Sequence, residues 1–290
     1  MRRANFFQIA FLLLAASLTQ TIAQQVRPQD DELARALRNQ GLEQYKEACF
    51  QDAIETFKKA VQLKPDYAEA YNDLGMTCVR LNRYDEAIES FNQAIHLNPG
   101  LAEARYNLGT AYYNLGRLKE AVTTLKRAIN LKPDYALAHN NLGVAYYKSG
   151  RFNEAIDSYK RALDVKPDWA EAHCMLALAL NSAGRSLEAI DSYNRAIALK
   201  PDYAEAHNCL GVAYYNLKRY REAVAAFTEA IRLRPEFALA RYNLGAISLV
   251  ISRREVALEQ YDTLKNLSNE LAGRLYNGIY KGMLLNVSER

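Results

Sequence analysis

The sequence predicts an all-α solenoid of antiparallel helix pairs. Prolines recur every 34 residues, at Pro65, Pro99, Pro133, Pro167, Pro201 and Pro235. Each period also holds two helical patterns of about a dozen residues, separated by a short break. A period of this size is typical of stacked repeats, in which each unit contacts only its neighbours.

The segment before the repeats is expected to direct export. Residues 1–3 are positively charged, residues 6–18 are apolar apart from Gln8, and residues 21–23 are small enough for signal cleavage. The apolar run is short for a bilayer span, so we expect a signal peptide over residues 1–23 and a periplasmic or secreted protein. The alternative is an uncleaved membrane anchor over residues 4–19. Residues 24–33 are polar and are expected to be a linker.

Seven repeats of 34 residues are expected over residues 34–271. Counting back from the prolines, they begin at Ala34, Ala68, Ala102, Ala136, Ala170, Ala204 and Ala238. At each boundary a proline ends one helix, and Asp66 with Glu69 has the spacing of a capping box for the next. Gly116 lies at the break within a repeat, where a helix end favours positive φ. These fixed stops and restarts predict one antiparallel helix pair per repeat.

Small residues recur at two positions of the repeat, counted from its first residue. Position 8 is glycine in six repeats, and position 20 is alanine in all seven. Glycine inside a helix costs about 0.5–1 kcal/mol relative to alanine, so we expect the two backbones to touch there. Large side chains at position 24 are expected to fill the adjoining core. They are Phe57, Phe91, Leu125, Tyr159, Tyr193, Phe227 and Tyr261.

This unit resembles the tetratricopeptide repeat (TPR). Its Leu-Gly pair, aromatic, alanine, large apolar residue, second alanine and proline are Leu108, Gly109, Tyr112, Ala121, Leu125, Ala128 and Pro133 in the third repeat. The resemblance covers residues 34–271 and implies a right-handed superhelical TPR array. It further implies a protein-protein interaction module that binds an extended peptide or partner segment in its concave groove. The alternative is a structural adaptor of a cell-envelope assembly that uses convex or edge surfaces.

Polar residues at position 6 are candidates for the groove, because the resemblance places this position on the concave face. They are Asn39, Asp73, Asn107, Asn141 and Asn243. An asparagine amide offers a donor and an acceptor to a peptide backbone, so these residues could form a binding ladder. The alternative is that a solvent-facing position merely tolerates asparagine.

Tyrosines form a second candidate set, because a ring with a polar tip suits a recognition surface. They are Tyr106 and Tyr242 at position 5, and Tyr113, Tyr147 and Tyr215 at position 12. A role in the helix-pair core is the alternative. Four cations, Arg35, Arg38, Lys46 and Arg80, make the N-terminal end of the groove basic, which suits an acidic ligand or a solvated helix face.

The C-terminus and the cysteines complete the prediction. Residues 272–290 are expected to form a capping helix and tail, because apolar residues follow a four-residue spacing from Leu271 to Met283. Cys49 and Cys78 are a candidate disulfide in an exported protein, with free thiols as the alternative. Cys174 and Cys209 lie on neighbouring groove helices, where the separation of the helices decides between a disulfide and free buried thiols.

Several function classes are not expected. The net charge is +4, and it falls to +2 without Arg2 and Arg3, whereas nucleic-acid binding requires a stronger basic surface. We find no catalytic set outside the repeat register and expect neither enzyme activity nor a cofactor. His139, His173 and His207 recur once per repeat and project in parallel, so they are not expected to converge on a metal. A protein or peptide partner is therefore expected.

Overall fold

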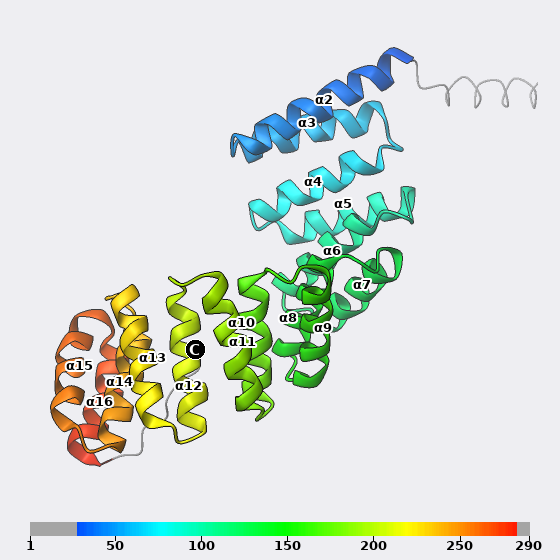
Figure 1. Ribbon diagram of the computed structural model, residues 1–290. Coiled ribbons are helices and arrows are strands. Elements are labelled where there is room, and N and C mark those ends of the chain that lie inside the picture. The colour runs from blue at the N-terminus through cyan, green and yellow to red at the C-terminus, as the bar shows by residue number, and fades with distance from the viewer. Residues whose placement is uncertain (1–27, 283–290) are drawn as a thin grey trace, which may run out of the picture. The chain divides into compact units, whose positions relative to one another are not determined.

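The computed structural model describes residues 28–282, which form fifteen α-helices and no strand (Figure 1). The predicted all-α solenoid of helix pairs is confirmed, since each helix contacts its partner within the repeat and the next repeat within its unit. The predicted signal peptide lies outside the described residues. None of the described helices is both long and apolar enough to cross a membrane.

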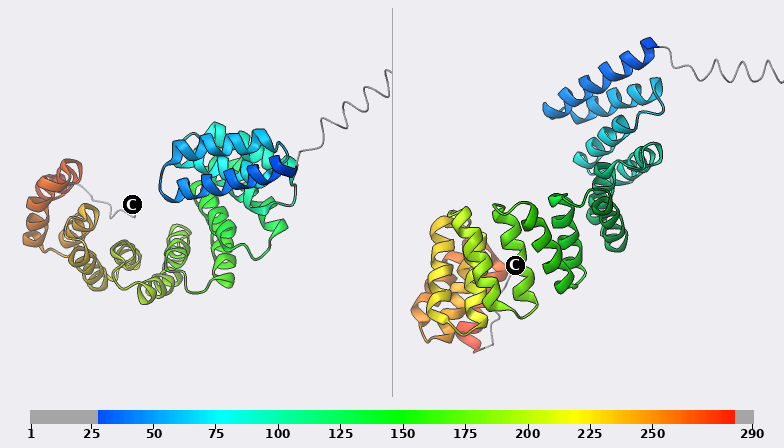
Figure 2. Two further views of the ribbon diagram at one scale, coloured as in Figure 1. Left: turned by 90° about the horizontal axis from the view of Figure 1, so that it is seen from above. Right: turned by 45° about the vertical axis from the view of Figure 1, so that its right-hand side comes forward.

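The chain divides into two compact units, an N-terminal unit up to Leu131 and a C-terminal unit from Lys132. Successive helices pair within each of them (Figure 2). The N-terminal unit contains α2 (Pro28–Lys46), α3 (Phe50–Leu63), α4 (Ala68–Arg80), α5 (Tyr84–Leu97), α6 (Ala102–Asn114) and α7 (Leu118–Leu131). The C-terminal unit contains α8 (Ala136–Lys148), α9 (Phe152–Val165), α10 (Ala170–Ser182), α11 (Ser186–Leu199), α12 (Ala204–Asn216), α13 (Tyr220–Leu233), α14 (Ala238–Val250), α15 (Arg254–Leu267) and α16 (Asn269–Lys281).

The first helix begins earlier than expected. α2 starts at Pro28, inside the segment predicted to be a linker, so residues 28–33 are helical. Proline suits the start of a helix because its missing N–H needs no partner there, and the Asp30 and Asp31 carboxylates favour the positive N-terminal end. Asp31 also pairs with Arg35 and with Lys64, the C-cap residue of α3. These contacts extend the helix beyond the repeat register.

The boundaries between repeats differ from the predicted capping box. Tyr67 is the N-cap residue of α4 and makes no side-chain cap hydrogen bond, and Tyr203 of α12 behaves in the same way. Asp66 lies one residue too early to cap, in a turn where its backbone oxygen accepts a hydrogen bond from the Ala68 N–H at 3.1 Å. Proline and the turn therefore restart the helix without the carboxylate.

The break within each repeat always adopts the same backbone conformation. Position 15 has a positive φ in all seven repeats, as predicted for Gly116, whose φ is 73°. Only three of these residues are glycine. The seven are Ala48, Asn82, Gly116, Gly150, Gly184, Lys218 and Ser252. Because L-residues disfavour this region, the four other residues place strain at their breaks.

Position 8 packs differently from the predicted contact between backbones. A Cβ atom added at Gly75 would lie 2.6 Å from the Phe91 ring, which comes from position 24 of the same repeat. The same relation joins Gly41 to Phe57, Gly143 to Tyr159 and Gly211 to Phe227. The glycine therefore accommodates a buried ring against the helix backbone. These rings, together with position 20, form the core of each pair.

The last helix, α16, covers the end of the C-terminal unit and contacts both α14 and α15. It begins at Asn269, where Ser268 accepts a hydrogen bond from the Leu271 N–H at 3.3 Å, and it ends at Lys281. Leu275 is fully buried and replaces the position-24 side chain against Gly245. By its contacts with α14 and α15, this single helix takes the place of a following repeat at the end of the stack.

Candidate ligand-binding groove

The first helices of successive repeats contact one another and form a continuous face within each unit. We call this surface the first-helix face: α2, α4 and α6 in the N-terminal unit, and α8, α10, α12 and α14 in the C-terminal unit. Side-chain hydrogen bonds cross from one first helix to the next between residues 35 positions apart. They form two rows, one between positions 5 and 6 and the other between positions 12 and 13.

Several predicted groove residues take part in the row of hydrogen bonds between positions 5 and 6. The Asn107 amide donates to Oδ1 of Asn72 at 2.9 Å, and the Asn243 amide donates to Oδ1 of Asn208 at 3.0 Å. Asn243 is fully buried and Asp73 is 7% exposed, so the prediction that they line the groove is wrong. Neighbouring helices approach so closely at these positions that the polar groups must satisfy one another.

An ion pair replaces the amides at the N-terminal end of this row. Arg38 donates to the Asp73 carboxylate at 2.5 Å. Burial raises the pKa of Asp73 above its ordinary value, and the hydrogen bond from Arg38 opposes that rise. The arginine therefore compensates for a buried charge, and it is not available to a ligand.

The row at positions 12 and 13 lies near the other end of the first helices. The Tyr147 and Ser182 hydroxyls are 3.1 Å apart, and the Asn216 amide donates to Asn181 Oδ1 at 3.1 Å. Positions 5 and 13 were not predicted from the sequence to be hydrogen-bonding partners of positions 6 and 12. Their signal is a spacing of 35 residues between polar side chains, one more than the period of the repeat.

The tyrosines divide into exposed and covered residues. Tyr106, Tyr113, Tyr147 and Tyr215 are half-buried on the first-helix face, as are Asn107 and Asn141, and Asn39 is exposed. Position 12 also packs on the following helix: the ring centroids of Tyr147 and Phe152 are 5.4 Å apart, and those of Tyr215 and Tyr220 are 5.9 Å apart. These two tyrosines therefore have the packing role, and part of each side chain stays exposed on the first-helix face.

Tyr242 is not a groove residue. It is fully buried beneath α16, where Arg274 donates to its hydroxyl at 3.1 Å and stacks at 4.5 Å from the ring centroid. The prediction is wrong because α16 covers Tyr242, as a following first helix covers position 5 in other repeats, where Asn72 is 4% and Asn208 is 1% exposed. Burial raises the pKa of the Tyr242 hydroxyl.

A hollow of about 170 Å³ opens on the first-helix face of the N-terminal unit. Its lining combines apolar and polar side chains, and it contains the predicted residue Asn107. The lining residues are Tyr45, Met76, Val79, Arg80, Phe91, Asn107 and Thr110. They come chiefly from α2, α4 and α6, so the hollow lies where three first helices meet.

Arg80 gives this hollow its charge. Its guanidinium lies 5.7 Å from the Tyr45 ring centroid and 4.8 Å from that of Phe50. Arg35, Arg38 and Lys46 each pair with a carboxylate, whereas no ion pair within residues 28–282 involves Arg80. Of the four predicted cations, Arg80 is therefore the one without a carboxylate partner in the described part of the chain, and it is held by the Tyr45 and Phe50 rings and by a hydrogen bond to the Tyr45 hydroxyl at 3.4 Å.

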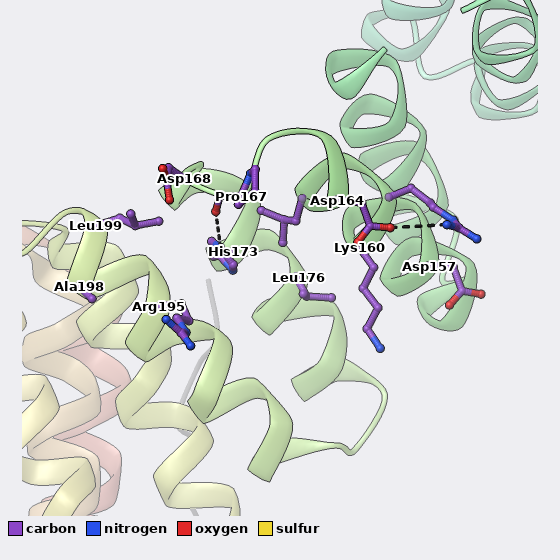
Figure 3. Close-up of a pocket in the computed structure, with 12 residues that line it drawn as sticks. Asp157, Lys160, Asp164, Pro167, Asp168, His173, Leu176, Arg195, Ala198 and Leu199 are labelled. Atoms are coloured by element: carbon purple, nitrogen blue, oxygen red, sulfur yellow. Dashed lines mark hydrogen bonds and ion pairs between the residues drawn. The ribbon is translucent and has the colours of Figure 1, made fainter. Parts of the chain in front are cut away.

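A larger hollow, of about 880 Å³, lies in the C-terminal unit between the second helices α9 and α11. Figure 3 shows His173 and Leu176 of α10 between Lys160 of α9 and Arg195 of α11. Ala198 also lines it and is the one alanine at position 29, where the other repeats have Gln62, His96, Asn130, Asp164, Arg232 and Asn266.

The histidines and cysteines show no metal site. Nε2 of His139 and of His173 each lie 2.8 Å from the backbone oxygen of the proline six residues earlier, a local structural contact. Within the described residues, no three metal-ligating side chains gather in one place. The candidate disulfide is not formed in this structure. All four cysteines are in the thiol form, with Cys49 exposed and Cys78 buried among apolar side chains.

Stacked helix pairs joined by rows of inter-repeat hydrogen bonds define the class of helical repeat solenoids. Sequence comparison assigns the family: the chain belongs to the tetratricopeptide repeat family. Models described as TPR repeat or tetratricopeptide repeat match residues 45–93, 75–116, 109–150, 140–204 and 204–237. TPR proteins are protein-interaction modules, which makes this chain one of that class. A search of curated protein sequences finds no match.

Solved structures support the fold. MamA is 30% identical, with 56% of this chain and 94% of MamA aligned and a TM-score of 0.53. YrrB, described as a TPR protein with an unusual peptide-binding site, is 23% identical over 64% of this chain and 96% of YrrB, with a TM-score of 0.57. PilF of Pseudomonas aeruginosa is 20% identical over 71% of this chain and 94% of PilF, with a TM-score of 0.62.

Proposed function

We propose that this chain is a non-catalytic interaction protein that binds an extended protein segment along the first-helix face of its N-terminal unit. The observation that carries the proposal is the hollow at Met76, Arg80 and Thr110. A recess lined by both apolar and polar side chains suits one anchoring side chain of a peptide. The peptide-binding site ascribed to YrrB, a protein with the same fold, is consistent with such a use.

The polar lining residues Arg80 and Asn107 favour a ligand with a negative charge beside its anchoring side chain. Arg80 is exposed and is held in place by Tyr45 and Phe50, so little side-chain freedom is lost when it pairs with a carboxylate. The half-buried Asn107 lies beside it and still has amide hydrogen-bonding capacity after its bond to Asn72. Together they would position a peptide backbone next to the recess.

A peptide-display library selected on the purified chain tests this proposal. Thr110→Tyr should fill the hollow and abolish capture of the selected peptides, and Arg80→Glu should remove the acidic ones. Thr123→Tyr is the matched control, because Thr123 is exposed on α7, away from the hollow. The Thr110 and Thr123 hydroxyls each donate a hydrogen bond to the backbone carbonyl four residues earlier at 3.0 Å, so both substitutions alter the same local contact. Equal capture by the two threonine variants would refute binding at this hollow.

The second candidate function is a scaffold that uses the outer surface, and the larger hollow between α9 and α11 favours it. Ala198→Arg should fill that hollow and weaken an assembly built on it, as measured by crosslinking in the native compartment. Ala225→Arg, at an exposed position of α13, is the control. An assembly that survives Ala198→Arg but is lost with Thr110→Tyr would instead favour the first-helix face.

We further propose that residues 1–23 direct export of the chain. Their charged start and short apolar run support this proposal. Fusion of the segment to a reporter enzyme that is active only after export should give activity, which Leu12→Arg with Leu14→Arg should abolish. An inactive reporter would refute export, and full-length chains retained in the membrane would support the anchor.

A further inference from the structure

Two cysteines replace the asparagine pair in one step of the first-helix face. Cys174 is at position 5 of its repeat on α10, and Cys209 is at position 6 of the next repeat on α12. In two other steps these positions hold side chains in direct contact, Asn72 with Asn107 at 2.9 Å and Asn208 with Asn243 at 3.0 Å. The repeat register therefore places the two cysteines at the positions whose side chains meet in those steps, and the Cys174 side chain also contacts Tyr203.

The second row of hydrogen bonds shows that α10 and α12 keep this register. Asn181 of α10 accepts a hydrogen bond from Asn216 of α12 at 3.1 Å, again between residues 35 positions apart. Cys174 is 8% exposed and Cys209 is half-buried, so both lie at the helix contact and neither is on the open surface. Burial raises the pKa of Cys174 to about 11.

We propose that Cys174 and Cys209 form a reversible disulfide that fastens α10 to α12 across the first-helix face. The oxidant is a low-molecular-weight disulfide such as oxidised glutathione. The Cys209 thiolate attacks one of its sulfur atoms and releases one thiol. The Cys174 thiolate then attacks the Cys209 sulfur and releases the second. Two cysteine protons pass to the released thiols, so both cysteines are oxidised while the small disulfide is reduced.

The bond should also fix the spacing of the two helices. A disulfide holds the Cα atoms about 4.4–6.8 Å apart. Formation of the bond therefore sets the separation of α10 and α12 at this end, while the Asn181–Asn216 contact holds the other end. This mechanism is independent of the ligand proposed for the N-terminal unit.

Mass spectrometry of the reduced full-length chain, before and after equilibration with oxidised glutathione, tests the proposal. After alkylation and trypsin digestion, the peptides of residues 162–185 and 196–218 each contain one of the two cysteines. We expect them as a single linked species that lacks two hydrogen atoms and carries no alkyl group. Dithiothreitol should restore two separate alkylated peptides.

Three variants make the outcome decisive. Cys174→Ser and Cys209→Ser should each abolish the linked species, and Cys49→Ser with Cys78→Ser should retain it. The oxidised chain should also melt at a higher temperature than the reduced chain, a shift that both single variants lose. Full alkylation of Cys174 and Cys209 after oxidation, or only mixed disulfides with glutathione, would overturn the proposal.

Discussion

The Asn107 amide donates a hydrogen bond to Oδ1 of Asn72 at 2.9 Å, from one first helix to the preceding one. Asn72 is 4% exposed, so its oxygen depends on this donor in place of water. A residue selected as a ligand contact is thus also a structural link between repeats. Stability and recognition are therefore coupled at this position, and they must be measured separately.

Removal of this donor should destabilise the chain. Asn107→Ala leaves the Asn72 oxygen buried without its partner, at a cost of about 1–3 kcal/mol in the free energy of unfolding. Asn114→Ala, at an exposed position of the same helix, should change it by less than about 0.5 kcal/mol. Urea unfolding of both variants checks this, and equal stabilities would contradict the role of the hydrogen bond.

Gly75→Ala should destabilise the second repeat. The added methyl would lie 2.6 Å from the ring of Phe91, which is fully buried and cannot move away freely. Overpacking of this kind costs about 1–3 kcal/mol. Gly273→Ala is the control, because open space surrounds that helical glycine and alanine should stabilise α16 by about 0.5–1 kcal/mol. The melting temperature should therefore fall for Gly75→Ala and rise for Gly273→Ala.

Lys218→Gly should stabilise the C-terminal unit. Lys218 has a φ of 60° at position 15, where Gly150 has a φ of 71°. Glycine removes the steric penalty of this conformation, and the free energy of unfolding should rise by about 1 kcal/mol. The reverse change, Gly150→Lys, should lower it by a similar amount. A stabilising effect of both substitutions in denaturant titrations would be inconsistent with backbone strain at the break.

The Arg38–Asp73 pair should give a pH-dependent variant. Burial raises the pKa of Asp73 and Arg38 opposes the rise, so Arg38→Met should raise this pKa further in the folded chain. The penalty is absent below the unfolded pKa of about 3.9, where both states are protonated, and is complete above the folded pKa. Arg38→Met should therefore lose more stability at pH 7 than at pH 4.

The matched control for this prediction removes the titrating group. In Asp73→Asn with Arg38→Met, the difference from wild type should vary less between these two pH values than it does for Arg38→Met alone. Free energies of unfolding from urea titrations at both pH values supply the comparison. If the Arg38→Met penalty is the same at both, the uncompensated carboxylate is not its cause.

The sequence by itself determined the period, the helix pairs and the breaks. Pro65 and its equivalents stop helices locally, and the small residue at Gly75 with the large one at Phe91 specifies a pair within a single repeat. These signals act over fewer than 34 residues, so a pattern along the chain is enough to read them. The capping box was wrong because a one-residue shift in a turn is invisible to such a pattern.

Only the tertiary structure decided which polar side chains remain for a ligand. Asn243 and Asp73 share a position with the exposed Asn39, yet each is buried by a partner from the preceding first helix. Tyr242 is covered by α16, which takes the place of a following repeat at the end of the stack. Burial depends on what the neighbouring helices contribute at the contact, and the residue type at one repeat position does not contain that information.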